Sequence, residues 1–361
     1  MNWFLKMFLL KSSVLTNKYL FSFILLLLQT YCSVAYAQNA SLYINSGIEK
    51  AKRGDFKSAI IDFNKAIKVD PQNSFAYYNL GTAKGKGIGD MEGAINAFTK
   101  AIELNPTYAL AYNNRGNAKK KLGDYKGATS DYTKAIVINP NYEIAYYNRG
   151  IIKKDLGDLK GANYDYNKVL QLNPTNALAF GKLANLKYEL LDYKGAIADY
   201  TNALQLKPNY FSAYQNRGNA KNNLGYYQGA IDDFSELIRL NPNSAIAYYN
   251  RGSVRSQALL DNEGAIDDFN QSIKLKPDYF QSYNNRANAK KKLGDVDGAI
   301  DDFNKAISIN PKYAISYYNR ALARLELGDN LGACIDYKLA RNFSNFDLLQ
   351  WIDSQMKNWC E

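Results

Sequence analysis

The chain has 361 residues, of which 47% are hydrophobic and 22% are charged, with a formal net charge of +11 and no histidine. The lack of histidine excludes Ser-His-Asp and Cys-His nucleophilic sites and the usual zinc and non-haem iron centres. No two of the three cysteines have the spacing of a metal site, and no Gly-rich phosphate-binding motif occurs. We therefore predict no metal, no cofactor and no enzymatic activity.

Residues 1–37 have the layout of an export signal. The first half contains lysines but no acidic residue, a charge-free run follows, and Ala35-Tyr36-Ala37 forms a small-x-small cleavage site. This layout predicts a secretory signal peptide and therefore an exported protein, in the periplasm, in a lumen or outside the cell. The alternative is an uncleaved membrane anchor over residues 19–37, a stretch just long enough to span a bilayer.

After the leader, prolines recur at a nearly constant interval of 34 or 35 residues. They are Pro71, Pro106, Pro140, Pro174, Pro208, Pro242, Pro277 and Pro311. A proline ends a helix because it lacks the N–H group and its ring clashes with the preceding turn. The interval therefore indicates one supersecondary unit copied along residues 38–345. The copies begin near residues 40, 74, 109, 143, 177, 211, 245, 280 and 314.

Each copy predicts two helices joined by a turn. Counted from the start of a copy, position 4 is aromatic, position 8 is Gly or Ala, position 20 is Ala, and position 24 is Phe or Tyr in all nine copies. Positions 4 and 8 share one helix face, and positions 20 and 24 share another. Turns such as Leu122–Tyr125 supply a Gly helix stop and an Asp helix start. Two copies carry one extra turn residue, around 85–89 and 258–261, which is left out of the count.

This pattern resembles the tetratricopeptide repeat, a helical hairpin of about 34 residues with the A-x3-F…P signature. The resemblance implies an all-α fold, a right-handed superhelical solenoid of about nine helix-turn-helix units whose first helices line a concave groove. It also implies a non-enzymatic scaffold with a protein or peptide as partner. The alternative is a structural or assembly factor of an envelope or membrane-attached complex, docking through the convex face, the ridges or the cap.

The charged residues recur at fixed positions of the repeat. Position 11 is Lys or Arg in all nine copies, and six copies combine Arg at position 7 with Asp at position 23. These six pairs are Arg115 with Asp131, Arg149 with Asp165, Arg217 with Asp233, Arg251 with Asp268, Arg286 with Asp302 and Arg320 with Asp336. We interpret them as structural ion pairs within a repeat. The net positive charge is therefore not taken to indicate a nucleic-acid partner, and a membrane is expected only if the leader is retained.

Asparagine occupies position 6 in eight copies, and Lys182 is the exception. These residues are Asn45, Asn79, Asn114, Asn148, Asn216, Asn250, Asn285 and Asn319. They resemble the asparagine ladder of the repeat domain in O-linked N-acetylglucosamine transferase. A carboxamide has one acceptor and two donors, so such a ladder can bind the backbone of an extended peptide. Additional groove contacts are predicted from position 9 (Asn117, Asn185, Asn219 and Asn288) and from position 5 (Tyr78, Tyr147, Tyr249 and Tyr318). The alternative is that the position 6 asparagines hydrogen-bond within the array.

The end of the chain predicts a capping helix over residues 346–361. Its apolar residues at helical spacing are Leu348, Leu349, Ile352, Met356 and Trp359. A terminal repeat needs an amphipathic helix to cover its apolar face. Cys334 and Cys360 remain after leader removal, and export would place them in an oxidising compartment, so we predict a disulfide that fixes the cap. The alternative is two free thiols. The sequence does not indicate the oligomeric state.

Overall fold

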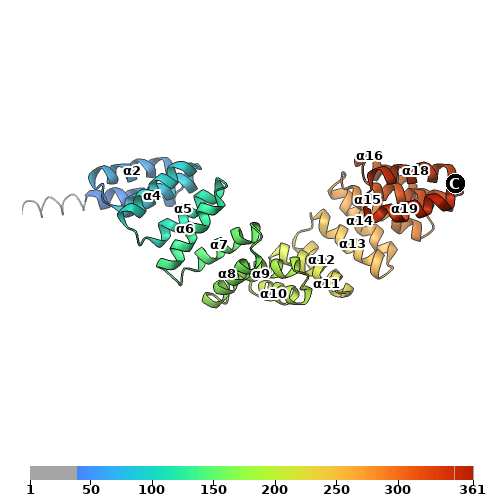
Figure 1. The fold of residues 1–361 in the computed structure, drawn as a ribbon, viewed down its shortest axis with the longest axis horizontal. Helices are drawn as coiled ribbons and strands as arrows, with labels where there is room; N and C mark the ends of the chain where they lie inside the picture. Colours follow the sequence, from blue (N-terminus) through green and yellow to red (C-terminus); the bar gives the residue numbers. More distant parts are fainter. Residues whose placement is uncertain (1–38, 345, 361) are drawn as a thin grey trace, which may run out of the picture. The chain divides into compact units, whose positions relative to one another are not determined.

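The structure, a computed structural model, describes residues 39–344 and 346–360. The predicted signal peptide, and its alternative as an anchor, lie outside these residues. Every regular element that the structure describes is a helix, and consecutive helices pack as hairpins (Figure 1). This confirms the all-α repeat fold. Within the described ranges, no helix is long and apolar enough to cross a membrane.

Contacts divide the chain into two compact units, one that ends at Asn173 and one that begins at Pro174. The first unit starts with a helix over residues 39–52. It continues with α2 (Phe56–Val69), α3 (Ser74–Thr82), the π-helix η1 (Ala83–Ile88), α4 (Met91–Leu104), α5 (Ala109–Lys121), α6 (Tyr125–Ile138), α7 (Glu143–Asp155) and α8 (Leu159–Leu172).

The second unit contains the remaining repeats and the last helix. Its elements are α9 (Ala177–Glu189), α10 (Tyr193–Leu206), α11 (Phe211–Asn223), α12 (Tyr227–Leu240), α13 (Ala245–Ala258), α14 (Asn262–Leu275), α15 (Phe280–Lys292), α16 (Val296–Ile309), α17 (Ala314–Glu326), α18 (Asn330–Phe343) and α19 (Phe346–Trp359). The right-handed coiling of the whole array stays a prediction.

The repeated apolar positions form the core, as the pattern predicts. The alanine at position 20 is 0% exposed in every copy, and the aromatic ring at position 24 is at most 3% exposed. Close approach of the two helices of a hairpin requires the small residue at position 8. A Cβ atom added at Gly116 would lie only 2.8 Å from the Tyr132 ring. Each hairpin therefore closes by packing an aromatic ring of its second helix onto the backbone of its first.

The turns inside the hairpins follow the predicted start and stop signals. In the third copy the Asp124 side chain accepts from the Gly127 N–H at 2.8 Å and begins α6. Gly123 before it has a φ of +83°, a left-handed conformation that costs glycine little. The Asp124 N–H bonds to the carbonyl of Lys119, five residues back, at 3.0 Å.

The two long copies absorb their extra residue by widening this turn. The N–H groups of Asp90 and Asp261 bond to carbonyls six residues back, on Lys84 and Arg255, at 3.0 and 2.9 Å. In the second copy the widening forms η1, so the stretch predicted as a turn around 85–89 is largely a π-helix. In the seventh copy α13 runs to Ala258 and Leu260 takes a φ of +59°.

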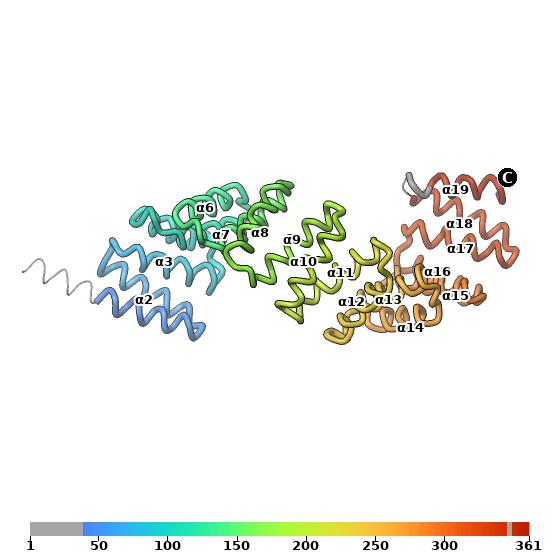
Figure 2. The backbone as a smooth tube through the Cα atoms, turned by 90° about the horizontal axis from the view of Figure 1, so that it is seen from below, coloured from blue at the N-terminus to red at the C-terminus, as the bar shows by residue number. Residues whose placement is uncertain are grey.

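The last helix covers the end of the array. Figure 2 shows α17, α18 and α19 side by side at the C-terminal end. Ile352 is 0% exposed, and it packs with Met356 against Ala333 and Tyr337. Trp359 is predicted on this apolar face, but its side chain is 51% exposed in the last turn of α19, although its backbone carbonyl contacts Cys334 of α18. The side chain of Leu348 lies outside the described part.

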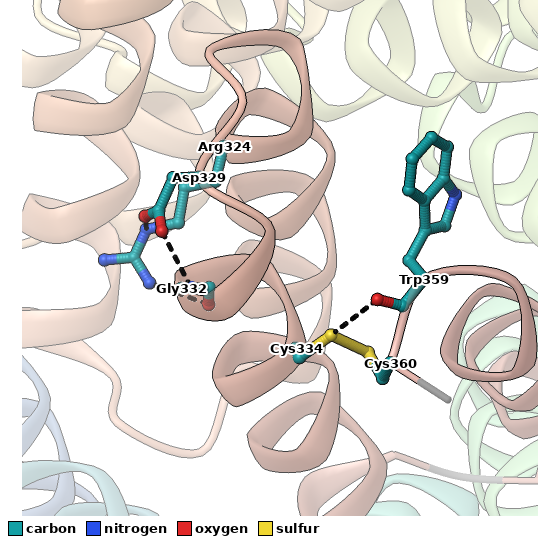
Figure 3. Close-up of a disulfide and its surroundings, with 6 residues drawn as sticks. All are labelled: Arg324, Asp329, Gly332, Cys334, Trp359 and Cys360. Atoms are coloured by element: carbon teal, nitrogen blue, oxygen red, sulfur yellow. Dashed lines mark hydrogen bonds and ion pairs between the residues drawn. A yellow bond between two sulfur atoms is a disulfide. The ribbon is translucent and has the colours of Figure 1, made fainter.

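A disulfide joins α18 to the residue after α19. The sulfur atoms of Cys334 and Cys360 are 2.09 Å apart and their Cα atoms 5.5 Å apart (Figure 3). The carbonyl oxygen of Trp359 lies 3.2 Å from the Cys334 sulfur. This is a polar contact rather than a hydrogen bond, because a disulfide sulfur has no proton to donate. The bond links the cap covalently to the last repeat.

Candidate functional site

The six predicted Arg–Asp pairs are present and bidentate. In the third copy Arg115 Nε donates to Asp131 Oδ2 at 2.9 Å, and Nη2 donates to Oδ1 at 2.7 Å. The same pairing occurs in the other five copies. Each guanidinium also lies over the tyrosine at position 4, as Arg115 does over Tyr112 at 5.5 Å from the ring centroid. The interpretation as structural pairs is confirmed.

The cation at position 11 binds the same aspartate. Lys119 Nζ lies 2.8 Å from Asp131 Oδ2, and eight of the nine copies, this one included, have this contact. The exception is the second copy, where Ala97 replaces the aspartate and Lys84 pairs with Asp90 at 3.2 Å. These cations are therefore held inside the repeats, although in six copies two cations share one aspartate and a net positive charge remains.

Asp199 has a poorer environment than its counterparts. Position 7 of its repeat is Leu183, so its ion pair is with Lys187 alone, at 2.6 Å. Burial raises the pKa of the Asp199 carboxyl, and the bond from Lys187 offsets only part of this rise. A raised folded-state pKa contributes stability below the unfolded value, and this contribution is lost as pH rises through the folded pKa.

Leu183→Arg is expected to reverse this pH dependence, because the added guanidinium lowers the pKa of Asp199. The gain in free energy of unfolding over wild type should be about 1–2 kcal/mol near pH 7 and should shrink towards zero near pH ~2, where the carboxyl is protonated in both states. Urea unfolding at both pH values measures it, with Leu183→Met as the uncharged control. A difference that is the same at both pH values would contradict the assignment.

In each of the two units the position 6 asparagines lie on the surface formed by the first helices of its repeats, which we call the first-helix face of that unit. Five of them donate a side-chain N–H to the preceding repeat. Asn148 Nδ2 donates to Asn113 Oδ1 at 3.1 Å, and Asn216 Nδ2 donates to Asn185 Oδ1 at 3.0 Å. The other three are Asn114 to Tyr78, Asn285 to Tyr249 and Asn319 to Asn284. The ladder therefore links consecutive first helices.

Several of these carboxamides keep unused hydrogen-bonding capacity. Among the described residues, no group donates to the Oδ1 of Asn148, Asn216 or Asn319. Asn79 bonds to the carbonyl of Phe75 in its own helix at 2.8 Å. Asn45 is exposed, and the half-buried Asn250 makes no side-chain hydrogen bond to the described part of the chain. The face is thus polar and partly preorganised.

The asparagines predicted at position 9 fall into two groups, according to whether position 24 of their copy is a tyrosine or a phenylalanine. Asn117 Oδ1 accepts from the Tyr132 hydroxyl at 2.7 Å, and Asn185 Oδ1 accepts from the Tyr200 hydroxyl at 2.6 Å. Burial raises the pKa of the Tyr132 phenol, so it stays protonated and donates. These bonds leave the Asn117 N–H groups available. Asn219 and Asn288 lie in copies with a phenylalanine at position 24, which offers no such donor.

The tyrosines at position 5 contact the array itself. The hydroxyls of Tyr78 and Tyr249 accept from Asn114 and Asn285 of the next repeat, at 3.1 and 3.3 Å. Tyr147 and Tyr318 pack on the position 24 rings of their own hairpins. The contact of these tyrosines with a peptide stays a prediction, and part of their surface already joins helices of the array.

Two cavities lie between successive first helices. Cavity 1, of about 260 Å³, lies between the α3–η1 segment and α5, and cavity 2, of about 270 Å³, lies between α13 and α15. Every residue that lines cavity 2 has a counterpart in cavity 1 at a fixed offset of 171 residues, as from Asn114 to Asn285. The pairs are Thr82 and Ser253, Gly85 and Ser256, Lys86 and Gln257, Phe98 and Phe269, Asn114 and Asn285, Asn117 and Asn288, Lys120 and Lys291, and Lys121 and Lys292.

These cavities were not predicted, although the sequence contains a signal for them. Residues 112–124 and 283–295 are identical except for Gly116 and Ala287, and each segment follows a copy with the extra turn residue. No cluster of His, Cys, Asp or Glu side chains within the described ranges could hold a metal ion. The chemistry available on the first-helix face is therefore hydrogen bonding by asparagines and charge from lysines.

Comparison with known families decides the identity of the fold. Profiles described as TPR repeat or tetratricopeptide repeat match residues 40–73, 88–123, 109–142, 144–176, 218–257, 280–313 and 303–334. The chain belongs to the tetratricopeptide repeat family. Members of this family generally bind other proteins or peptides as scaffolds, and this chain has the repeat architecture suited to that role.

The chain is similar to several solved structures at low sequence identity. A tetratricopeptide repeat protein from Parabacteroides merdae is 22% identical, with a TM-score of 0.50, over 70% of this chain and 99% of its own. The pilF protein of Pseudomonas aeruginosa is 19% identical, with a TM-score of 0.54, over 62% and 99%. YrrB, described as a TPR protein with an unusual peptide-binding site, is 27% identical, with a TM-score of 0.48, over 55% and 99%. No functionally curated protein matches the sequence.

Proposed function

We propose that this protein is a non-enzymatic scaffold that binds an extended segment of a partner protein on the first-helix face, through the asparagines at position 6. One observation carries the proposal. Asn148 and Asn319 are each held by one donated N–H, while within the described residues nothing bonds to the Oδ1 atom or the second N–H. Asn216 is held by Asn185 and also bonds to the Tyr200 hydroxyl, so its Oδ1 atom is the part that remains. An acceptor and a donor on one fixed group match the N–H and C=O of an extended backbone.

The internal hydrogen bonds support this role because they reduce the entropy lost on binding. A carboxamide that is already oriented by the neighbouring repeat does not need to be ordered by the ligand. Because the contacts would be made to backbone groups, recognition would depend little on the partner's side chains. Asn250 offers its whole carboxamide, since it is not engaged by the described part of the chain.

A second candidate is docking through the last two helices. Leu331 and Ile335 on α18 are 76% and 50% exposed, and Trp351 and Trp359 on α19 are 65% and 51% exposed. Exposed large apolar side chains are often found at protein–protein contacts. This surface would suit an assembly role, in which the end of the array, rather than the first-helix face, contacts the partner.

Changing Asn250 to alanine separates binding from stability. The free energy of unfolding should stay within about 0.5 kcal/mol of wild type, because no hydrogen bond within the array is lost. Asn148→Ala and Asn216→Ala should each cost about 0.5–1.5 kcal/mol, because each breaks a link between repeats. The triple variant Asn148→Ala, Asn216→Ala, Asn250→Ala should still be helical. It should bind a library of random peptides more weakly than wild type, and the loss should extend over many peptide sequences.

The control is Arg239→Ala, which removes an exposed ion pair with Glu236 on a second helix. It should change neither stability nor peptide binding appreciably. If the triple variant binds the library as wild type does, the first-helix face is not the site, and the last two helices become the better candidate. Loss of binding on Trp351→Ala would then support them.

We also propose export as the location of the protein. The layout of residues 1–37 supports it, and a disulfide between Cys334 and Cys360 suits an oxidising compartment. Cell fractionation combined with sequencing of the mature N-terminus tests this proposal. A cytosolic protein would contradict export, and an intact leader in the membrane fraction would support the anchor.

A further inference from the structure

The two cavities have corresponding lining residues but differ in the partners of their lysine side chains. In cavity 2 the lysines already have partners: Lys291 Nζ lies 2.7 Å from Glu326 Oε1, and Lys292 Nζ donates to the carbonyl of Ser256 at 3.0 Å. In cavity 1 the counterparts Lys120 and Lys121 form no ion pair with the described residues, and Lys86 adds a third cation where cavity 2 has Gln257.

We propose that cavity 1 binds the acidic side chain of a glutamate or aspartate in a bound polypeptide. Cavity 2 does not bind one, because its lysines are already bonded to groups of the protein itself. The proposal rests on the proposed function, in that it requires a polypeptide on the first-helix face. A carboxylate site in cavity 1 would add a preference for acidic residues to the first-helix face, which otherwise binds only backbone groups of the polypeptide. The lining of cavity 1 contains three lysines and no acidic residue.

The chemistry of the lining favours a carboxylate. Lysine ammonium groups and carboxamide N–H groups are donors that pair with carboxylate oxygens. The Asn117 oxygen is occupied by the Tyr132 hydroxyl, so its N–H groups are the part that remains for a ligand. Thr82 lines the cavity as well, but its hydroxyl donates to the Tyr78 carbonyl at 3.0 Å and can therefore only accept.

Cavity 2 contains an internal version of this contact. Glu326 comes from the following repeat and places its carboxylate against Lys291. The residue at the same offset in the first unit is Asp155, whose side chain is one methylene shorter, and it forms no ion pair with Lys120 in the described part of the chain. The lysine that an internal acid satisfies in one copy is therefore left for an external acid in the other.

A small residue at one position of the repeat accounts for the space in cavity 1. Position 12 of the long copies is Gly85 or Ser256, whereas the copies after them have Lys120 and Lys291 there. A small residue at this position leaves space between successive first helices. Phe98, which is 3% exposed, forms an apolar wall. A glutamate side chain, with an apolar stem and a charged end, fits about 260 Å³ lined in this way.

A matched pair of peptides tests the proposal on the whole protein. Both are Ser- and Thr-rich, acetylated and amidated, and they differ only in a central glutamate or glutamine. Calorimetry should show one site for the glutamate peptide and at least tenfold weaker binding of the glutamine peptide, as expected for a charge-assisted contact of about 1.5 kcal/mol or more. The double variant Lys86→Gln, Lys120→Gln should remove this difference.

The control removes the same charge elsewhere in the first unit. Lys126 and Lys134 are exposed residues of α6 without an ion pair in the described ranges, and Lys126→Gln, Lys134→Gln should preserve the preference. An equal loss in both double variants would mean non-specific attraction and would overturn the proposal. A glutamine peptide with a free C-terminus that binds better than the capped glutamate peptide would assign the contact to a terminal carboxylate instead, which also overturns it.

Cavity 2 provides a gain-of-function test. Gln257→Lys together with Glu326→Gln should free Lys291 and restore the third cation, so the number of glutamate-peptide sites should rise from one to two. A stoichiometry that stays at one would overturn the assignment of cavity 2. If neither cavity discriminates the peptides while Asn250→Ala still weakens library binding, this inference fails and the proposed function stands. If replacing the position 6 asparagines by alanine does not change library binding, the proposed function itself is wrong, whatever the result at the cavities.

Discussion

Replacing Asp165 by alanine is expected to lower the free energy of unfolding by about 3–5 kcal/mol, the largest effect of any single change considered for this protein. Asp165 is 0% exposed, and its two oxygens are bound by Arg149 at 2.7 Å and Lys153 at 3.0 Å. Its removal leaves two cations facing each other without a counter-charge. Denaturant unfolding monitored by helical circular dichroism measures the loss.

A double-mutant cycle with Arg149→Ala isolates the pair. Arg149→Ala alone should cost less than Asp165→Ala, about 1.5–3 kcal/mol, because Lys153 still compensates the aspartate. The coupling energy between the two positions should exceed about 1 kcal/mol. The exposed pair Arg239–Glu236, at 2.6 Å, is the control and should couple by about 0–1 kcal/mol. A coupling near zero for Arg149 and Asp165 would return the arginines to the candidates for ligand binding.

Removing the disulfide should have the second largest effect. Cys334 and Cys360 are 26 residues apart in sequence, and a closed loop of this length stabilises by about 3 kcal/mol through the entropy of the unfolded chain. The double variant Cys334→Ser, Cys360→Ser should therefore unfold at lower denaturant concentration, and α19 should separate first, because Ile352 and Met356 are its main apolar contacts.

Thiol counting on the native, unreduced protein checks the premise. A chain without residues 1–37 should show no free thiol before reduction and two after it. Reductant should lower the stability of the wild-type protein and leave the double serine variant unchanged, which separates loss of the bond from general effects of the reductant. Two free thiols in the native protein would contradict the disulfide, and the cap would then rest on packing alone.

The ion pairs show what kind of tertiary contact a single sequence can reveal. Arg at position 7 occurs only in copies with Asp at position 23, and the structure joins them in all six copies. The prediction of these ion pairs was possible because the nine repeats of one chain can be aligned with one another. Nine copies of one unit show which residues occur together: the copy with Leu80 at position 7 has Ala97 in place of the aspartate. The match is imperfect, because Asp62 and Asp199 occur without an arginine in their own copies.

The role of the asparagines at position 6 could not be predicted from the repeats in the same way. A carboxamide at position 6 has the same chemistry whether it faces a ligand or the preceding repeat, so the pattern allowed both interpretations. The structure shows that Asn114, Asn148 and Asn216 donate across repeats. That outcome depends on the distance between successive first helices, which comes from packing and not from any spacing within a repeat.

The sequence by itself determined the period, the two helices of each copy, their caps and their buried positions. These features depend on contacts within a hairpin, between residues separated by one or a few helical turns, and every copy repeats them. Only the tertiary structure decided where the carboxamide groups bond, how the extra residue is absorbed as η1, and that Gly85 and Ser256 leave matching cavities. These features depend on how one repeat stacks on the next, where a small residue or a widened turn creates space that no pattern along a single helix contains.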